Sequence, residues 1–422
     1  MDLWSDISLG EVTHDYNSFS AEQRESLIGY MNRHFPPAVF SLHLQHRRKA
    51  LANMEGEKNV LDGAVQEFPP FVPAAGIDAS PANLRGHALV LTAGGEGERL
   101  RLSLISEGVP ARELENFTKA TYSLPGFYGD FGTLQTNLAM IAFFCAEYGM
   151  DIPVIVTTGS EGSDTARVIP GLLERYENFG LANIRVVMQD ERLHFTVDEK
   201  IVCRADGGNI IPVTQPDETG GPLMKLREKT GAGGPSALEW LETLGCDKII
   251  VVQATALYDQ RLLPLIAGAL RGHDCIGAGI LREGFPVDDP YGTFVSLKRG
   301  GESRTVIIEQ HTRNDATRAV RDGSGKYHLP YNTGFYAFEN SLLAGQGLPD
   351  YATSPKEILP GLPRSPKAGY AATALLPLAK NPQVLTIDPD MFHVLKTTED
   401  LGPLAKLGKR RGLDEICRKM VK

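Results

Sequence analysis

The feature that most constrains the fold of this chain is an alternation of short apolar runs with amphipathic stretches, which begins at residue 87. The runs are rich in Val, Ile and Leu and predict buried strands, whereas several of the stretches between them have helical periodicity. Strands that alternate with helices predict an α/β fold whose mixed, mostly parallel sheet carries helices on both faces. We expect strands at 88–92, 152–157, 184–189, 248–254, 275–281, 305–309 and 334–338, and helices at 134–148, 164–179 and 236–244.

The chain before residue 85 predicts a helical region of its own. Ser20 and Gln23 have the spacing of a capping box that opens a helix at 21–34, and a second helix is expected at 38–54. A proline-rich link at 68–81 can continue neither a helix nor a strand. We therefore expect an N-terminal helical region at 1–84, an α/β domain at 85–345 and a small C-terminal region at 346–422.

The overall composition excludes several classes of protein. The net charge of −9 argues against a general nucleic-acid binder, which needs a basic surface. The five cysteines are scattered without a CxxC pair, so the sequence indicates neither a disulfide framework nor a zinc site. The N-terminus lacks the features of a signal peptide, and no apolar stretch approaches the roughly 18 residues that span a bilayer. We expect a cytoplasmic protein.

The strongest local signal is a glycine loop directly after the first expected strand. Gly94, Gly95 and Gly97 would let backbone N–H groups approach a phosphate closely, and Arg99 adds a positive charge. Leu100 stands where a dinucleotide fingerprint needs its third glycine, and the chain has no GxxxxGK[ST] motif, so neither of those phosphate loops is present. By itself the segment could also be a tight strand-to-helix turn with a solvated arginine.

The segment 92–100, TAGGEGERL, resembles the LAGGxGTRL signature of the sugar-nucleotide pyrophosphorylases, with Glu98 in place of the usual threonine. Further segments resemble, in the same order, motifs of the eukaryotic-type UDP-glucose and UDP-N-acetylhexosamine pyrophosphorylases. The resemblance extends over residues 85–405. It implies a Rossmann-like nucleotidyltransferase fold of the GT-A type, in which the α/β domain is catalytic and the C-terminal region completes the active site.

On this resemblance, three segments would bind the nucleotide. Lys119, in FTKATYSL, would offset phosphate charge, and Gln189, at the end of VMQ, would contact uracil, whose edge a glutamine can pair as both donor and acceptor. Gly233 and Gly234, in KTGAGGP, would approach the nucleobase, and Pro235 suits the first turn of a helix. Each also has a plain alternative: a solvated lysine, a glutamine bonded to a nearby loop, and a common glycine-rich turn.

The sugar 1-phosphate side depends on four later segments. The run 289–297, DPYGTFVSL, leads to Glu309 in VIIEQH, which would accept hydrogen bonds from sugar hydroxyls. Asn332 and Gly334, in YNTGFYAF, match the family motif NTGxYxF and would lie on the sugar or metal side. The segment MFHVLKTTEDL matches, residue by residue, a family motif that supplies a phosphate-contacting lysine, which is Lys396 here. Lys367, in LPRSPK, matches a further phosphate contact only loosely. The plain alternative for both lysines is a solvated side chain.

One segment departs from the family pattern. The stretch 248–259 resembles a strand that ends in VDNL, whose aspartate binds a divalent metal, but Thr255 occupies that position. Because Mg2+ prefers hard anionic oxygen ligands, a threonine hydroxyl is a poor substitute. Three alternatives stay open: phosphates and water hold the metal, Asp259 reaches in, or catalysis is weak. The protein ligand of the metal is therefore unknown.

The function that the resemblance implies is transfer of a uridylyl group from UTP to a sugar 1-phosphate, with Mg2+ as the cofactor and pyrophosphate as the second product. Arg99, Lys119 and Lys396 would be the catalytic cations. The implied partners are UTP and a sugar 1-phosphate, without nucleic acid or membrane. The alternatives are a nucleotidyltransferase for another base and a non-catalytic UDP-sugar-binding protein, which only Thr255 favours.

Overall fold

The computed structural model describes residues 16–421 except Glu96, Thr230, Ala232, 282–290, Gln346 and Pro360. The chain divides into two compact units, each built from three separate segments. These boundaries differ from those expected, because residue 60 divides the expected N-terminal region and residue 371 divides the expected C-terminal region. Unit 1 comprises Met1–Val60, Asp190–Gly221 and Pro349–Ala371, and unit 2 comprises Leu61–Gln189, Pro222–Leu348 and Ala372–Lys422.

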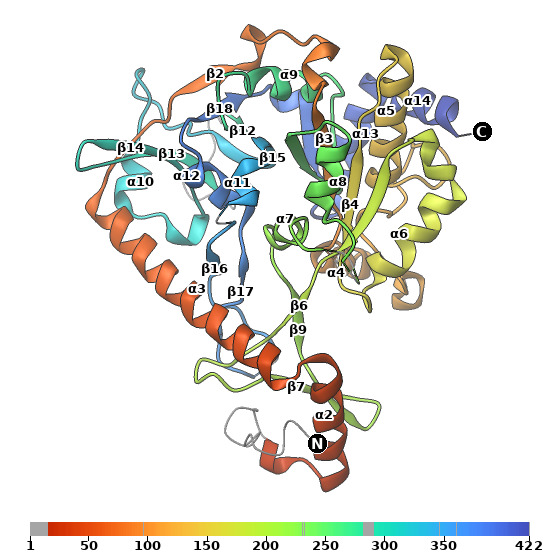
Figure 1. The fold of residues 1–422 in the computed structure, drawn as a ribbon, viewed down its shortest axis with the longest axis vertical. Coiled ribbons are helices and arrows are strands. Elements are labelled where there is room, and N and C mark those ends of the chain that lie inside the picture. Colours follow the sequence, from red (N-terminus) through yellow and green to blue (C-terminus); the bar gives the residue numbers. More distant parts are fainter. Residues whose placement is uncertain are drawn as a thin grey trace. The chain divides into compact units, whose positions relative to one another are not determined.

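A mixed sheet forms the centre of unit 2 (Figure 1). Its main path has the order β2-β18-β12-β15-β10-β3-β4-β5, in which β15 is antiparallel to both neighbours and every other pairing is parallel. The mixed, mostly parallel α/β sheet expected from the sequence is confirmed. These strands are β2 (Phe71–Pro73), β18 (Pro382–Thr386), β12 (Cys275–Ile280), β15 (Tyr331–Glu339), β10 (Lys248–Gln253), β3 (His87–Thr92), β4 (Val154–Thr158) and β5 (Ile184–Met188).

Every residue of β4 and β12 is buried, which requires cover on both faces of the sheet. Helix α9 packs against β10, β12 and β15, and α6 packs against β4. The helices of unit 2 are α4 (Glu98–Ser106), α5 (Thr133–Tyr148), α6 (Asp164–Arg175), α7 (Gly221–Lys225, from its second residue), α8 (Ala237–Thr243), α9 (Leu262–Ala269), α10 (Asp315–Ala319), α11 (Ser341–Ala344), α12 (Leu375–Leu378), α13 (Leu401–Arg410) and α14 (Leu413–Met420).

Two further sets of strands extend unit 2. The strands β1 (Val65–Glu67), β13 (Thr293–Arg299) and β14 (Glu302–Ile308) join the sheet through β13, which also pairs with β15. The strand β11 (Ala256–Tyr258) pairs antiparallel with β19 (Phe392–Val394), so a late segment of the chain returns to the end of β10. That return positions much of the candidate site.

Unit 1 is organised around α2 (Ala21–His34) and the first part of α3 (Pro37–Gly63). The capping box is present as expected, because the backbone N–H of Gln23 donates to Ser20 Oγ at 3.2 Å and that of Ser20 donates to Gln23 Oε1 at 3.0 Å. Its core joins apolar residues of α2 to residues of the segment 193–210. The strands of unit 1 are β6 (Glu191–Leu193), β7 (Cys203–Asp206), β8 (Asn209–Pro212), β9 (Thr214–Pro216), β16 (Asp350–Ala352) and β17 (Ala368–Tyr370).

Several expected boundaries were wrong. Helix α3 continues to Gly63 instead of ending at 54, and the proline-rich link after it contains the short strand β2. Helix α6 ends at Arg175 because Glu177, Asn178 and Phe179 all have positive φ, which a helix cannot accommodate. Within the described residues, no helix is both long enough and apolar enough to cross a membrane.

Candidate active site

The glycine loop follows β3 at the carboxyl edge of the sheet, where ligands of parallel sheets bind. Two of its glycines are required by close packing. A Cβ at Gly94 would overlap the amide nitrogen of Gln189, and a Cβ at Gly97 would lie 2.6 Å from the Cβ of Lys119. Gly97 also has a φ of +79° at the start of α4, whereas a Cβ at Gly95 would meet open space. The loop thus lies against two residues that the sequence assigned to the same site.

Gln189 directly follows β5 and is held against the end of β4, the strand next to β3. Its backbone N–H donates to the carbonyl of Thr158 at 3.2 Å, and its side chain is buried against Gly94. Among the described residues, none donates a hydrogen bond to Gln189 Oε1, although this atom is buried. A buried acceptor without a partner is unfavourable, so Gln189 is suited to receive an N–H group from a ligand.

The predicted loop at 231–234 has no described contact with Gln189, so the roles of Gly233 and Gly234 stay predictions. Gly231 and Gly233 both have positive φ, and the N–H of Gly233 donates to the carbonyl of Gly231 at 2.7 Å. Ser236 caps α8 in a capping box with Glu239. Pro235 therefore precedes the cap, instead of lying in the first helical turn as expected.

Lys119 is half-buried near two charged groups. Its pKa is lowered to about 8, chiefly by burial and also by the positive charge of Arg99, while the negative charge of Asp400 acts in the opposite direction. No described carboxylate lies within ion-pair distance of its ammonium group. Arg99 is exposed in the first turn of α4. The two cations therefore belong to one electrostatic neighbourhood, as expected.

Lys396 follows β19 and comes to the same neighbourhood from the C-terminal segment. The backbone N–H of Leu395 donates to the carbonyl of Thr255 at 2.9 Å, and that of Lys396 donates to Asp400 Oδ2 at 2.7 Å. Its ammonium nitrogen lies 3.5 Å from the centre of the Tyr291 ring, a cation–π contact. Asp400 therefore binds the backbone of Lys396 and also acts through its charge on Lys119.

Of the expected sugar residues, Glu309 is the one on which the charge of Lys396 acts. The carboxyl of Glu309 is buried, and burial raises its pKa, while the charges of Arg313 and Lys396 oppose that rise. The amide oxygen of Asn332 accepts hydrogen bonds from the N–H of Gly334 and the hydroxyl of Tyr336, both at 2.9 Å. Because these bonds occupy the oxygen, the amide of Asn332 presents its N–H groups to a ligand.

Gly334 is required by its own geometry. Its φ is +74°, and a Cβ there would lie 2.7 Å from the side-chain nitrogen of Gln253 at the end of β10. Lys367, by contrast, lies in unit 1, where its charge opposes the burial that raises the pKa of Glu218. Its role as a phosphate contact stays a prediction. Asp289 and Pro290 of the expected DPYG segment lie outside the described residues.

The expected metal position does not fit a protein-built magnesium site. Thr255 is buried and offers only a hydroxyl, and the described residues contain no cluster of three or more acidic, histidine or cysteine side chains that could hold a metal. Asp259 cannot substitute. It lies four residues further along an extended strand, roughly 13 Å away at the rise of a strand, and Arg261 and Arg411 both bind its carboxylate.

Several residues of this site were not identified from the sequence. Asp400 and Tyr291 contact Lys396, Gln253 packs against Gly334, and the carbonyl of Thr158 holds Gln189. Asp400 had a detectable signal, because Thr397 and Asp400 have capping-box spacing, which the structure confirms. The other contacts join distant segments and leave no local pattern.

The architecture is shared with proteins of known structure. The UDP-N-acetylglucosamine pyrophosphorylase of Trypanosoma brucei, solved with an inhibitor, has 14% sequence identity and a TM-score of 0.67 over 96% of this chain and 82% of its own. A mutant of the UDP-glucose pyrophosphorylase of Leishmania major has 14% identity and a TM-score of 0.61 over 91% and 78%. The chain has the fold of the UDP-sugar pyrophosphorylases.

Another Leishmania major UDP-glucose pyrophosphorylase mutant, solved in complex with UDP-glucose, has 14% identity and a TM-score of 0.56 over 81% of this chain and 70% of its own. No protein-family model and no curated protein matches the sequence. The relation to the UDP-sugar pyrophosphorylases is therefore one of fold, and the activity of this chain must be argued from its own residues.

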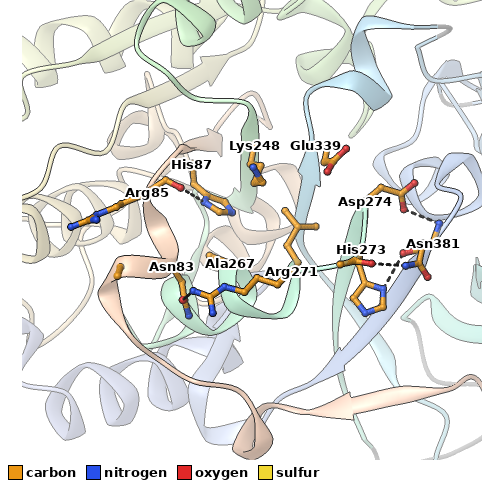
Figure 2. A pocket seen from close by; sticks show the side chains of 13 residues that line it. Asn83, Arg85, His87, Lys248, Ala267, Arg271, His273, Asp274, Glu339 and Asn381 are labelled. Carbon is orange, nitrogen blue, oxygen red and sulfur yellow. Dashed lines mark hydrogen bonds between the residues drawn. The ribbon is translucent and has the colours of Figure 1, made fainter.

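A cavity of about 460 Å³ lies at the opposite, amino edge of the sheet (Figure 2). It is lined by the first residues of β3 and β10 and the last residue of β15, and by none of the predicted site residues. Its polar groups largely bond one another: Arg271 donates to Asn83 Oδ1 at 2.5 Å, and Asp274 accepts the N–H of Asn381 at 2.9 Å. Because the motifs and their cations gather at the carboxyl edge, we place the candidate active site there and not in this cavity.

Proposed function

We propose that this protein is a uridylyltransferase that forms a UDP-sugar and pyrophosphate from UTP and a sugar 1-phosphate. One observation carries the proposal. Lys119 packs against the glycine loop and lies within the electrostatic influence of Asp400, whose carboxylate binds the backbone of the Lys396 segment. Support also comes from a protein of the same fold that was solved in complex with UDP-glucose. A cytoplasmic location belongs to this proposal.

The proposed reaction is an in-line attack by a phosphate oxygen of the sugar 1-phosphate on the α-phosphorus of UTP. No protein nucleophile is needed, and the work of the protein is to position two polyanions and offset their charge. Because its pKa is about 8, Lys119 is mostly protonated at pH 7 and supplies a cation in a partly desolvated place. Lys396 and Arg99 supply further positive charge from separate segments.

Mg2+ is part of the proposal as a cofactor held chiefly by phosphate oxygens and water. When bound, it would offset charge on the reacting phosphates. The described protein residues contribute little to it, since Thr255 has only a hydroxyl and the carboxylate of Asp259 is taken by arginines. We therefore expect a higher Mg2+ requirement than a site with a protein carboxylate would show.

The experiment that tests the function is incubation with UTP, Mg2+ and a panel of sugar 1-phosphates, with detection of pyrophosphate. The reverse reaction, UDP-sugar with pyrophosphate, is measured in parallel. We expect pyrophosphate-dependent turnover with at least one sugar. Tight binding of UDP-sugar in calorimetry without turnover in either direction at any Mg2+ concentration would instead establish the non-catalytic binding protein, the second candidate that Thr255 favours.

The identity of the base is a separate prediction carried by Gln189. Its buried, unpartnered Oε1 is suited to accept the N–H of uracil, and Gly94 holds the side chain in place. We expect kcat/KM for UTP to exceed that for CTP, ATP and GTP, and Gln189→Leu to reduce the advantage of UTP about tenfold, the scale of one lost hydrogen bond. Equal kcat/KM for all four nucleotides in the wild-type protein would remove the base assignment.

A further inference from the structure

Asp400 closes the loop that carries Lys396. It ends the 3-10 turn Thr398–Asp400, and its Oδ2 accepts the backbone N–H groups of Lys396 at 2.7 Å and of Thr397 at 2.9 Å. These are the N–H groups that a turn leaves without partners, so a side-chain acceptor at this position fixes the path of the backbone. The position of Lys396 therefore depends directly on this carboxylate.

The same carboxylate is ionised at neutral pH. Burial raises its pKa, but the interaction with His393 and the hydrogen bonds from the backbone of Thr397 and Lys396 outweigh burial, and the net pKa is lowered. His393 Nε2 lies 3.5 Å from Oδ1. Asp400 thus brings a full negative charge to a place where Lys119, Lys396 and Arg99 supply positive charge.

Asp400 acts on Lys119 through space. Its negative charge raises the pKa of Lys119, opposing burial and Arg99, and the two groups form no ion pair. The turn is also tied to the glycine-loop helix, because Thr398 Oγ1 lies 2.7 Å from Ser103 Oγ in α4. Since Gly97 at the start of α4 packs on the Cβ of Lys119, the turn, the loop and both lysines form one connected set.

We propose that Asp400 is a positioning residue whose carboxylate sets the Lys396 loop against α4 and whose negative charge acts on Lys119, so that both lysines meet the phosphates together. The inference rests on the proposed uridylyl transfer. It assigns Asp400 no contact with the reacting atoms, because its oxygens face the N–H groups of its own turn and His393.

Two substitutions separate the two parts of this role. Asp400→Asn keeps an oxygen that can accept the backbone N–H groups but removes the charge, whereas Asp400→Glu keeps the charge but displaces the acceptor. The control is Asp390→Asn, which removes a carboxylate of the same type from an exposed ion pair with Arg410 in the same part of the chain.

The first readout does not require catalysis. NMR titration of lysine ammonium groups in the ligand-free protein gives the pKa of Lys119, whose signal is assigned by its loss in Lys119→Arg. We expect Asp400→Asn to lower this pKa by about half to one unit, and Asp400→Glu and Asp390→Asn to leave it unchanged. An unchanged pKa in folded Asp400→Asn would overturn the electrostatic half of the proposal.

The second readout is the pH dependence of kcat/KM. Because protonated Lys119 carries the charge, kcat/KM should fall as pH rises through about 8 in the wild type, and through a lower pH in Asp400→Asn. Asp400→Glu should keep the wild-type pH profile while kcat/KM falls about tenfold or more at every pH, on the scale of a misplaced catalytic group. A full rate in Asp400→Glu would overturn the positioning half.

The two proposals fail in distinguishable ways. If the wild-type protein turns over nothing, the proposed function fails, yet the titration of Lys119 and calorimetric binding of UTP still decide whether Asp400 controls the lysines. If Asp400→Asn does not fold, Asp400→Glu still tests the positioning half of the proposal. The electrostatic half is then tested by comparing the pH profile of kcat/KM in the wild type with that in Lys119→Arg. A fall of kcat/KM at alkaline pH that persists in Lys119→Arg would count against the electrostatic half.

Discussion

Two aspartates lie at opposite ends of the short ladder formed by β11 and β19, and their surroundings differ sharply. Asp259 follows β11, is 1% exposed and is bound by the guanidinium groups of Arg261 and Arg411. Asp400 lies beyond β19, where its carboxylate accepts the backbone N–H groups of Lys396 and Thr397 and acts on Lys119 through space. One carboxylate is neutralised by pairing, and the other orders a region that stays positively charged.

The difference shows that the charge of a residue type does not predict its role until its partners are known. A buried carboxylate paired with arginines is a structural group, since its oxygens have no capacity left for a ligand. A carboxylate that binds backbone N–H groups can instead shape a loop and bias the pKa values of its neighbours. Three substitutions can break or sharpen this comparison.

The largest effect is expected at the positively charged end. Lys119→Ala removes a half-buried cation beside the glycine loop, and we expect kcat to fall on the order of 10²-fold or more, the scale of losing one group that stabilises charge in the transition state. Steady-state kinetics with pyrophosphate detection measures this. Lys409→Ala, at an exposed position on α13, is the control and should retain the wild-type rate. A kcat for Lys119→Ala within a few-fold of the wild type would remove Lys119 from the mechanism.

At Asp259, a substitution should change the stability of the protein and leave its catalytic rate nearly unchanged. Burial raises the pKa of Asp259, but the bonds from Arg261 and the charge of Arg411 outweigh burial and lower it. We expect Asp259→Asn to reduce the free energy of unfolding at pH 7 by roughly 1–3 kcal/mol while kcat changes little. Thermal melting of both proteins, together with kinetics at saturating Mg2+, measures the two effects.

The sign of the pH dependence follows from the lowered pKa. A carboxyl whose pKa is depressed in the folded state stabilises the protein above its unfolded pKa and loses that contribution as pH falls through the folded value. The difference in the free energy of unfolding between wild type and Asp259→Asn should therefore have its full size at pH 7 and shrink below about pH 4. If Asp259→Asn instead raised the Mg2+ requirement without lowering stability, Asp259 would be a metal ligand after all.

The smallest effect is expected at Thr255, which lies at the same end of the β11–β19 ladder as the Lys396 segment. Thr255→Asp adds an anionic oxygen close to the Lys396 segment, since the carbonyl of Thr255 accepts the N–H of Leu395. We expect the Mg2+ concentration for half-maximal activity to fall several-fold, because a carboxylate supplements phosphates and water as ligands. Brisk wild-type activity that saturates at low Mg2+ and is unchanged in Thr255→Asp would show that the metal carboxylate lies elsewhere.

The sequence predicted those elements that a local pattern encodes. It did not predict elements or contacts that depend on residues far apart in the chain. The capping box at Ser20 and the seven expected strands were predictable, because caps and buried apolar runs are encoded within a few residues. The short strands of unit 1 were not, since each carries only three or four residues and exists through pairing.

The same division applies within the candidate site. Gly94, Gln189 and Lys119 were found by motif, but their packing on one another was not, and neither was the burial that sets the pKa of Lys119. The arginine that helps neutralise Asp259 is Arg411, far along the chain, which is why Asp259 looked available for a metal. The sequence showed which charged residues are present, but it did not show which of them are buried or paired.

The order of strands in the sheet also bears on how the chain is made. Strand β18 pairs with β12 on one side and with β2 on the other, so the ribosome synthesises one neighbour early and β18 itself late. Until β18 leaves the ribosome, the backbone of β12 presents an open edge and β2 has no place in the sheet. Such an edge is a template for association between nascent chains. Completion of this part of the sheet therefore waits until β18 has been synthesised.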